Sequence, residues 1–145
     1  MLKNIPDIIS PALMNVLMEM GHGDEIVLAD ANFPAANLGK RVVYMCGHGV
    51  PAVLEAVLQL MPLDTFVEKP VLLMQTGAQF PERPPVWDVF REIIANSEEA
   101  AHFTEFEWLE RFDFYERTRN AFAVVSTSET SLYANIILKK GVVVE

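Results

Sequence analysis

Short runs of apolar and β-branched residues recur along this chain, and they hardly alternate with polar residues. A strand that is apolar at successive positions is usually covered on both faces, because a strand with one solvated face alternates. Segments with the helical period of apolar residues lie between most of these runs, and helices are the usual cover. The pattern therefore predicts an α/β layered sandwich. The predicted strands are residues 25–30, 41–46, 70–76, 121–127 and 134–144.

The clearest predicted helix begins at Pro11, because Ser10 before it is a good N-cap and proline is favoured in the first turn. Gly21 is the expected end of this helix, as the left-handed residue of a C-cap. The other predicted helices cover residues 50–63, residues 84–99 and, after a short strand in the ambiguous segment 104–120, the residues from about 112.

Length and charge limit the class of protein. A chain of 145 residues has the size of one ordinary domain, so we expect a single domain over residues 1–145. The formal net charge is −9, from 20 acidic and 11 scattered basic residues. Such a chain repels a polyanion at long range, so nucleic-acid binding is not expected. Hydrophobic residues make up 51%, which suggests more apolar surface than one subunit can bury and favours an oligomer.

Cysteine content and hydropathy bear on the compartment. Cys46 is the only cysteine, which excludes an internal disulfide and any CxxC motif and fits a reducing cytoplasm. The apolar N-terminal segment is interrupted by prolines and acidic residues, and nowhere is there a run of about 18 apolar residues. We therefore expect neither an export signal nor a membrane anchor.

His22 stands between Gly21 and Gly23, on a short loop between a predicted helix and a predicted strand. This loop is either a plain helix end or a site where the imidazole reaches a cleft and titrates near neutral pH. Asp30 ends the following strand, at the sheet edge where α/β proteins commonly bind ligands. Its carboxylate, expected at the same edge as His22, would accept hydrogen bonds from sugar hydroxyls or orient that histidine, although a turn-capping role explains it equally well.

Other polar residues have weaker signals. His48 repeats the Gly-His-Gly pattern, but with Cys46 it forms only a Cys-x-His pair, so a loop that starts a helix is preferred to a metal site. His102 lies in an acidic segment and is expected to be exposed and inert. Tyr133 and Asn135 would point to the same side of an extended chain, which suits a carbohydrate and equally suits packing at a sheet edge.

Three segments carry a resemblance that extends over nearly the whole chain: SPALMNVLMEMGHGDEIVLADANFPA, RFDFYERTRNAFAVV and YANIILKKGV. Their order and spacing resemble the family of small sugar mutarotases that contains D-ribose pyranase and L-fucose mutarotase. The resemblance implies a three-layer α/β sandwich with a central, mostly parallel sheet flanked by helices. It also implies a homodecamer of stacked pentamers and a reaction without cofactor or metal.

The resemblance also assigns roles to residues. The family's catalytic histidine corresponds to His22 and its sugar-binding aspartate to Asp30. Its Tyr-x-Asn pair corresponds to Tyr133 and Asn135, which would reach across a subunit interface to complete the site, with Tyr133 also a candidate proton-transfer group. Arg111 stands where the fucose branch has arginine and the ribose branch has histidine, and the FYER sequence that follows also resembles the fucose branch.

The expected activity is therefore that of an isomerase that interconverts the α and β anomers of L-fucopyranose in fucose utilisation. General acid and base catalysis opens and recloses the ring, which requires no nucleophile or redox group. Two alternatives remain open. One is a D-ribose pyranase-type activity, against which Arg111 argues, and the other is a non-catalytic fucose-binding subunit.

Overall fold

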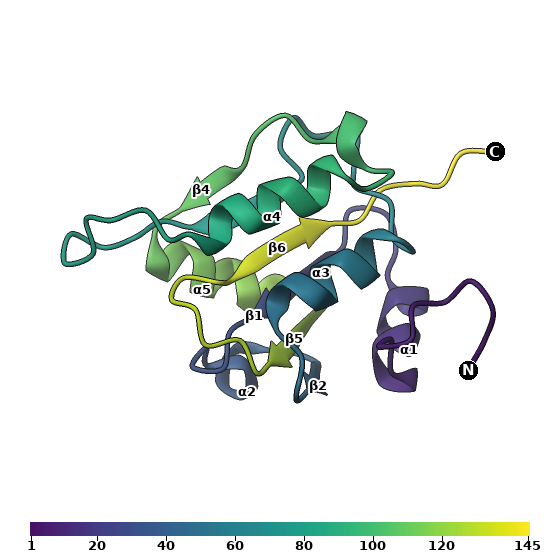
Figure 1. Ribbon diagram of the computed structural model, residues 1–145, viewed down its shortest axis with the longest axis horizontal. Helices are drawn as coiled ribbons and strands as arrows, with labels where there is room; N and C mark the ends of the chain where they lie inside the picture. Colours follow the sequence, from purple (N-terminus) through teal and green to yellow (C-terminus); the bar gives the residue numbers. More distant parts are fainter.

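Residues 1–145 are all described by the computed structural model of the protein. Helices and strands alternate along most of the chain, as the hydropathy pattern predicts (Figure 1). The helices are α1 (Pro11–Glu19), α2 (Ala35–Leu38), α3 (Val50–Leu58), α4 (Val86–Ala95) and α5 (Arg111–Asn120), with a 3₁₀ turn η1 (Ala100–His102). The strands are β1 (Glu25–Ala29), β2 (Val42–Met45), β3 (Val71–Met74), β4 (Glu107–Leu109), β5 (Ala123–Thr127) and β6 (Ile136–Lys139).

The six strands form one sheet in the order β2-β5-β1-β6-β3-β4. All neighbouring pairs are parallel except those of β6, which runs antiparallel to β1 and β3. Side chains of α1, α3 and α4 pack on one face with Ile26 and Leu28, and those of α2 and α5 pack on the other with Val27 and Ala29. The predicted three-layer sandwich with a mostly parallel sheet is confirmed.

The first helix begins as predicted and ends differently. The Ser10 side chain accepts a hydrogen bond from the Leu13 amide at 3.1 Å, and Pro11 occupies the first turn. The C-cap is Met20, whose backbone is extended, so the prediction of Gly21 as a left-handed stop is wrong. The left-handed residue of this loop is Gly23, with φ of 86°. The helix thus ends one residue before the predicted Gly21, and the left-handed turn comes two residues after it.

Two further helix boundaries differ from the predictions. Helix α3 ends at Leu58 and not at residue 63, because Pro62 lacks an amide hydrogen and disfavours helical backbone in the residue before it. Helix α2 was not predicted, since four residues are too few to show a period. It forms because Ala35 and Leu38 are buried against the sheet.

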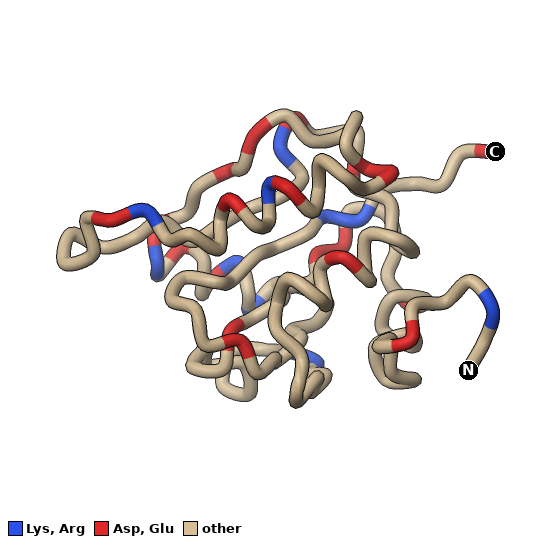
Figure 2. Tube along the Cα trace, in the orientation of Figure 1, with Lys and Arg blue, Asp and Glu red and all other residues tan.

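Charged residues are scattered along the backbone trace, and the Lys and Arg residues form no continuous stripe (Figure 2). One ion pair joins the layers: Arg117 of α5 donates two hydrogen bonds to Glu25 of β1, at 2.6 and 2.7 Å. The hydrogen bonds from Arg117 satisfy the Glu25 carboxylate, and the same pair raises the pKa of Arg117. This contact fixes α5, and with it Arg111, against the central strand.

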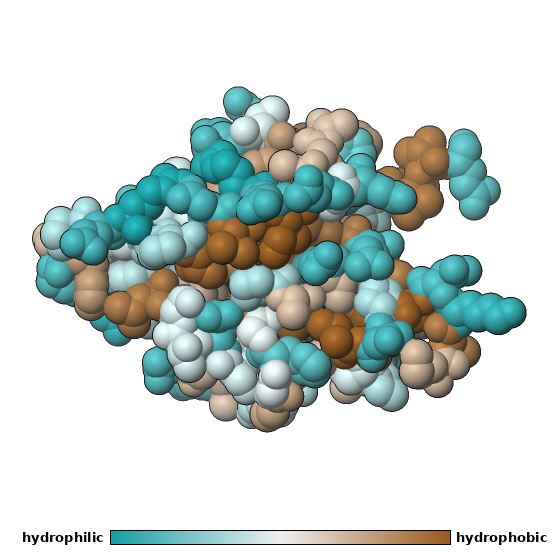
Figure 3. All heavy atoms as spheres, viewed as in Figure 1, coloured by the Kyte–Doolittle hydropathy of each residue, from teal (hydrophilic) through white to brown (hydrophobic).

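Several of the exposed hydrophobic side chains lie near the two termini. Met1, Leu2 and Met18 are exposed on the N-terminal side, and Val143 and Val144 extend from the C-terminal segment, which is brown in Figure 3. No helix combines the length and the apolar character needed to cross a membrane.

Candidate active site

A pocket of about 350 Å³ opens where β1 and β3 end and β6 begins. Because β1 and β3 run in the same direction and β6 runs opposite to both, the carboxyl ends of β1 and β3 and the start of β6 meet at one edge of the sheet, and side chains distant in sequence come together there. Four of the five residues expected at the site line this pocket together: Asp30, Arg111, Tyr133 and Asn135. The volume is within the range of roughly 300–1,000 Å³ typical of small-ligand sites.

Asp30 and Asn135 form the floor of the pocket as a reciprocal pair. The Asp30 amide donates to Asn135 Oδ1 at 2.8 Å, and Asn135 Nδ2 donates to Asp30 Oδ2 at 3.0 Å. Both residues are buried, and the other carboxylate oxygen of Asp30 accepts from the Asn32 amide. Burial raises the pKa of Asp30, although its hydrogen bonds oppose that shift. The pair therefore presents a rigid carboxylate and amide to a ligand.

Tyr133 lies beside this floor in an unusual backbone conformation. Its φ of 56° is in the left-handed region, so the assumption of an extended chain from Tyr133 to Asn135 is wrong. Neighbouring contacts hold it there: its carbonyl accepts from Trp87 Nε1 at 3.1 Å, and its hydroxyl accepts from the Gly77 amide at 3.2 Å. Strain of this kind is found at functional sites, where the surrounding packing maintains it.

Arg111 begins α5 and extends along the pocket rim. Its Nε–H donates to the Tyr115 hydroxyl at 3.1 Å, and the guanidinium carbon lies 5.4 Å from the centroid of the Tyr115 ring. The hydrogen bond to Tyr115 is the main reason that the pKa of Arg111 is raised. Since Nε is occupied, the two Nη groups are the donors left for a ligand.

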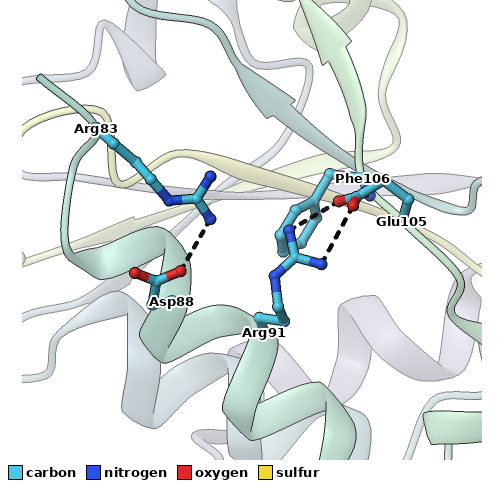
Figure 4. A network of polar contacts seen from close by, with 5 residues as sticks. All are labelled: Arg83, Asp88, Arg91, Glu105 and Phe106. Carbon is cyan, nitrogen blue, oxygen red and sulfur yellow. Dashed lines mark hydrogen bonds and ion pairs between the residues drawn. The ribbon is translucent and has the colours of Figure 1, made fainter.

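The loop between β3 and α4, residues 75–85, forms another wall and projects at the left of Figure 1. Phe80 packs edge-on against the Tyr133 ring at 5.5 Å. Figure 4 shows how the loop joins α4: Arg83 reaches Asp88 at 2.9 Å, and further along the helix Arg91 binds Glu105. These pairs connect the loop, α4 and the residues before β4.

His22 does not lie in this pocket. It precedes β1, whereas Asp30 follows it, and the Gly23 amide donates to the Lys140 carbonyl beyond the far end of β6. At about 3.3 Å per residue, β1 alone separates the two ends by roughly 13 Å, more than the width of a pyranose ring. The expectation that the strand brings His22 and Asp30 to the same edge is wrong.

Tyr133 and Asn135 were expected to reach across a subunit interface. Instead they line the pocket of their own chain, together with Asp30 and Arg111. Of the five residues expected at the site, only His22 lies outside the pocket of its own chain. Its Nε2 lies 3.0 Å from Asp64 Oδ1, and its ring packs against Phe66 at 4.8 Å.

The other two histidines, which were not expected to be site residues, lie where the sequence analysis placed them. His48 is in the turn before Gly49, the N-cap of α3. His102 is exposed and contacts Glu99.

Several site residues were missed from the sequence. Gln75 and Thr76 line the pocket just after β3. The rule that singled out Asp30, a polar residue at the carboxyl end of a strand, would have found them. Asp64 and Phe66 had no signal, because they lie in an irregular segment and meet His22 only through the fold.

Fold and pocket together define an α/β protein with a pocket for a small molecule, lined by polar and aromatic side chains, at the carboxyl edge of its sheet. The chain belongs to the RbsD / FucU transport protein family, whose model matches residues 3–143. It is 48% identical to the fucose mutarotase of Homo sapiens, over 97% of this chain and 94% of that protein. It is 46% identical to the L-fucose mutarotase of Haemophilus influenzae (strain PittGG), over 98% and 97%.

Solved structures agree with this assignment. The fucose mutarotase of Streptococcus pneumoniae in complex with L-fucose is 48% identical and has a TM-score of 0.90, with 99% of this chain and 100% of that chain covered. RbsD of Bacillus subtilis, solved with D-ribose, has a TM-score of 0.75 at 24% identity over 99% and 100%, and shares the fold.

Proposed function

We propose that this protein is an L-fucose mutarotase, an isomerase that interconverts the α and β anomers of L-fucopyranose. The observation that carries the proposal is the similarity over nearly the full chain to a fucose mutarotase solved with L-fucose. The pocket supports it, because a buried carboxylate-amide pair and a guanidinium are groups that bind sugar hydroxyls directionally. The proposal includes a single mutarotase domain over residues 1–145, which the extent of the family match supports.

The reaction requires one group that removes a proton and one that supplies a proton. A base takes the proton from the anomeric hydroxyl, the bond between C1 and the ring oxygen breaks, and an acid protonates the ring oxygen. Rotation of the open aldehyde and the reverse steps give the other anomer. All protons and electron pairs return to their starting groups, so no cofactor is consumed.

Tyr133 is the proposed acid. Its hydroxyl oxygen accepts from the Gly77 amide, which leaves its own proton free to point into the pocket. Asp30 and Asn135 would hold sugar hydroxyls, and the Nη groups of Arg111 would bind a further oxygen at the rim.

His22 is the proposed base, and it would serve the pocket of a second copy. Its distance from its own pocket excludes action within one chain, while its side chain is 43% exposed and available to a neighbour. The proposed assembly is therefore a homo-oligomer with sites at subunit interfaces, and the family resemblance favours a decamer. A cytoplasmic location is part of the proposal, and the exposed free thiol of Cys46 supports a reducing compartment.

Saturation-transfer NMR on anomer-equilibrated L-fucose tests the function. Saturating one anomeric proton should reduce the signal of the other anomer when protein is present, and the transfer should disappear with His22→Ala. Ribose, followed between its pyranose and furanose forms, is the matched comparison. Faster exchange of ribose than of fucose would favour the pyranase alternative, and fucose binding without faster exchange would leave only a binding subunit.

A further inference from the structure

We propose that Glu129 is a positioning residue for the sugar site, which ties the loop that carries Tyr133 to the start of α3 and to the backbone beside Asp30. This inference rests on the proposed mutarotase function. Glu129 is half-buried in the loop between β5 and β6, and it does not line the pocket. Its carboxylate and its backbone each contact other segments of the chain.

Both carboxylate oxygens of Glu129 accept hydrogen bonds from backbone amides. Oε2 accepts from the Val50 amide at 3.2 Å, and Oε1 accepts from the Ser131 amide at 3.0 Å. Val50 is the first residue of α3, whose N-cap, Gly49, has no side chain to satisfy that amide. One carboxylate therefore satisfies a helix start and a turn of the loop, at a place where the helix dipole favours a negative charge.

The backbone of Glu129 contacts the residues around Asp30. Its carbonyl accepts from the Ala31 amide at 2.9 Å, and its amide donates to Thr127 Oγ1 at 3.1 Å. Thr127 Oγ1 in turn donates to the Ala29 carbonyl at 2.8 Å. Because Ala29 and Ala31 stand on either side of Asp30, these bonds fix the start of the loop against the proposed sugar-binding carboxylate.

The Glu129 carboxylate also holds the segment that leads to Tyr133. Its bond from the Ser131 amide is the only hydrogen bond that residues 130–132 make within the chain. Tyr133 follows directly, with its strained φ of 56°. Because such a conformation persists only when the surroundings enforce it, loss of the carboxylate should let Tyr133 move.

The charge of Glu129 acts on Asp30 as well. Burial is the main reason that the pKa of Asp30 is raised, and the negative charge of Glu129 adds to the rise. Without that charge the pKa of Asp30 should fall, so the carboxylate that accepts sugar hydroxyls persists to a lower pH. The other titratable groups that line the pocket with Asp30 are Glu110, Arg111, Tyr115 and Tyr133.

Glu129→Gln removes the charge and one of the two acceptor oxygens. We expect kcat for L-fucose exchange to fall by about tenfold to a hundredfold, because the acid is displaced. KM at neutral pH should stay unchanged, since Asp30 and Asn135 hold each other. The rise of KM on acidification should occur at a lower pH than in the wild type.

Two further variants separate reach from charge. Glu129→Asp keeps the charge but is too short to reach both amides, so kcat should fall while the acidic rise of KM keeps its wild-type pH. Glu55→Gln, which removes an exposed charge from α3, should change neither. A wild-type pH profile in Glu129→Gln together with wild-type kcat overturns the inference.

Gly49→Ala moves the carboxylate while Glu129 itself is kept. A Cβ on Gly49 would lie 2.6 Å from Glu129 Oε2, the movable end of that side chain, and its φ of −86° is one that alanine adopts. Gly49→Ala should therefore lower kcat, and the double variant with Glu129→Gln should be no slower than the slower single variant, because both act on one contact. Losses that multiply would contradict this, and Gly49→Ala serves alone if Glu129→Gln fails to fold.

The place of Tyr133 is measured on the indole of Trp87, whose Nε1–H donates to the Tyr133 carbonyl. In ¹⁵N TROSY spectra the two indole signals are assigned with Trp108→Phe. The Trp87 signal should shift in Glu129→Gln and in Gly49→Ala, and not in Glu55→Gln. If the wild-type protein does not accelerate fucose exchange, the proposed function fails. If it does, and the folded variants keep its kcat and its Trp87 signal, only the role of Glu129 is refuted.

Discussion

Two inactive variants should restore activity when they are combined, because His22 and the pocket are at opposite ends of β1. His22→Ala keeps an intact pocket and lacks the base. Tyr133→Phe keeps the base and the ring packed against Phe80, and loses only the hydroxyl. If each site takes its pocket from one copy and His22 from another, a mixed assembly contains sites in which both groups are native.

The size of the effect follows from counting. In a random 1:1 assembly, half of the pockets come from the His22→Ala chain, and half of those face a neighbour that retains His22. About one quarter of the sites are then complete in a closed decamer in which pocket and base come from different copies. Fucose exchange should reach about a quarter of the wild-type rate, against a loss of about 10²- to 10⁴-fold in each parent.

The assay is saturation-transfer NMR on mixed assemblies. Each chain carries a different affinity tag, the two are co-expressed, and tandem purification followed by native mass spectrometry confirms that both are present. The control combines His22→Ala with the double variant His22→Ala/Tyr133→Phe, in which no site has a base. A co-assembled mixture with no more activity than its parents would refute the action of His22 in a second copy.

Three further predictions follow from single residues. Burial raises the pKa of Asp30 above 3.8, so the unfolded chain ionises first as the pH rises, and stability falls between 3.8 and the raised pKa. In Asp30→Asn this loss should be absent from denaturation curves measured across that window; equal pH slopes would contradict it. Phe114→Ala should lower the free energy of unfolding by about 3–5 kcal/mol, because the ring is fully buried, whereas exposed Phe112→Ala should change it little; denaturant titration decides. Arg111→Lys should raise the KM for fucose by about tenfold, since it loses the fork geometry and the bond to Tyr115 but keeps the charge; an unchanged KM would remove Arg111 from the site.

The strands of this protein could be predicted because burial on both faces leaves a local signal. Ile26, Val27, Leu28 and Ala29 are all fully buried, so their apolar run is visible without any knowledge of neighbours. Helix ends depend on finer competition. The sequence predicts Gly21 as the end of α1, yet the chain becomes extended at Met20, and the left-handed residue of the loop is Gly23.

Pocket residues could be predicted where they directly follow a strand in the sequence. They could not be predicted where their contacts join segments that are distant in the sequence. Asp30 could be proposed from its place after β1, and its pairing with Asn135 needs the antiparallel return of β6, which hydropathy does not encode. Asp64 had no local signal at all, because the segment after α3 is irregular and its contact with His22 spans 42 positions.

The separation of His22 from Asp30 also changes how the stretch between them should be understood. Side chains that precede and follow a five-residue strand necessarily lie at opposite edges of the sheet, so the sequence from Gly21 to Asp30 cannot be half of one site. Under the proposed mechanism it would supply parts of two different sites, a base at one edge and a carboxylate at the other. In the proposed assembly each copy contributes to two interfaces at once, and this mutual dependence would make catalysis a property of the assembly: dilution below the dissociation constant of the assembly should abolish exchange while the fold persists.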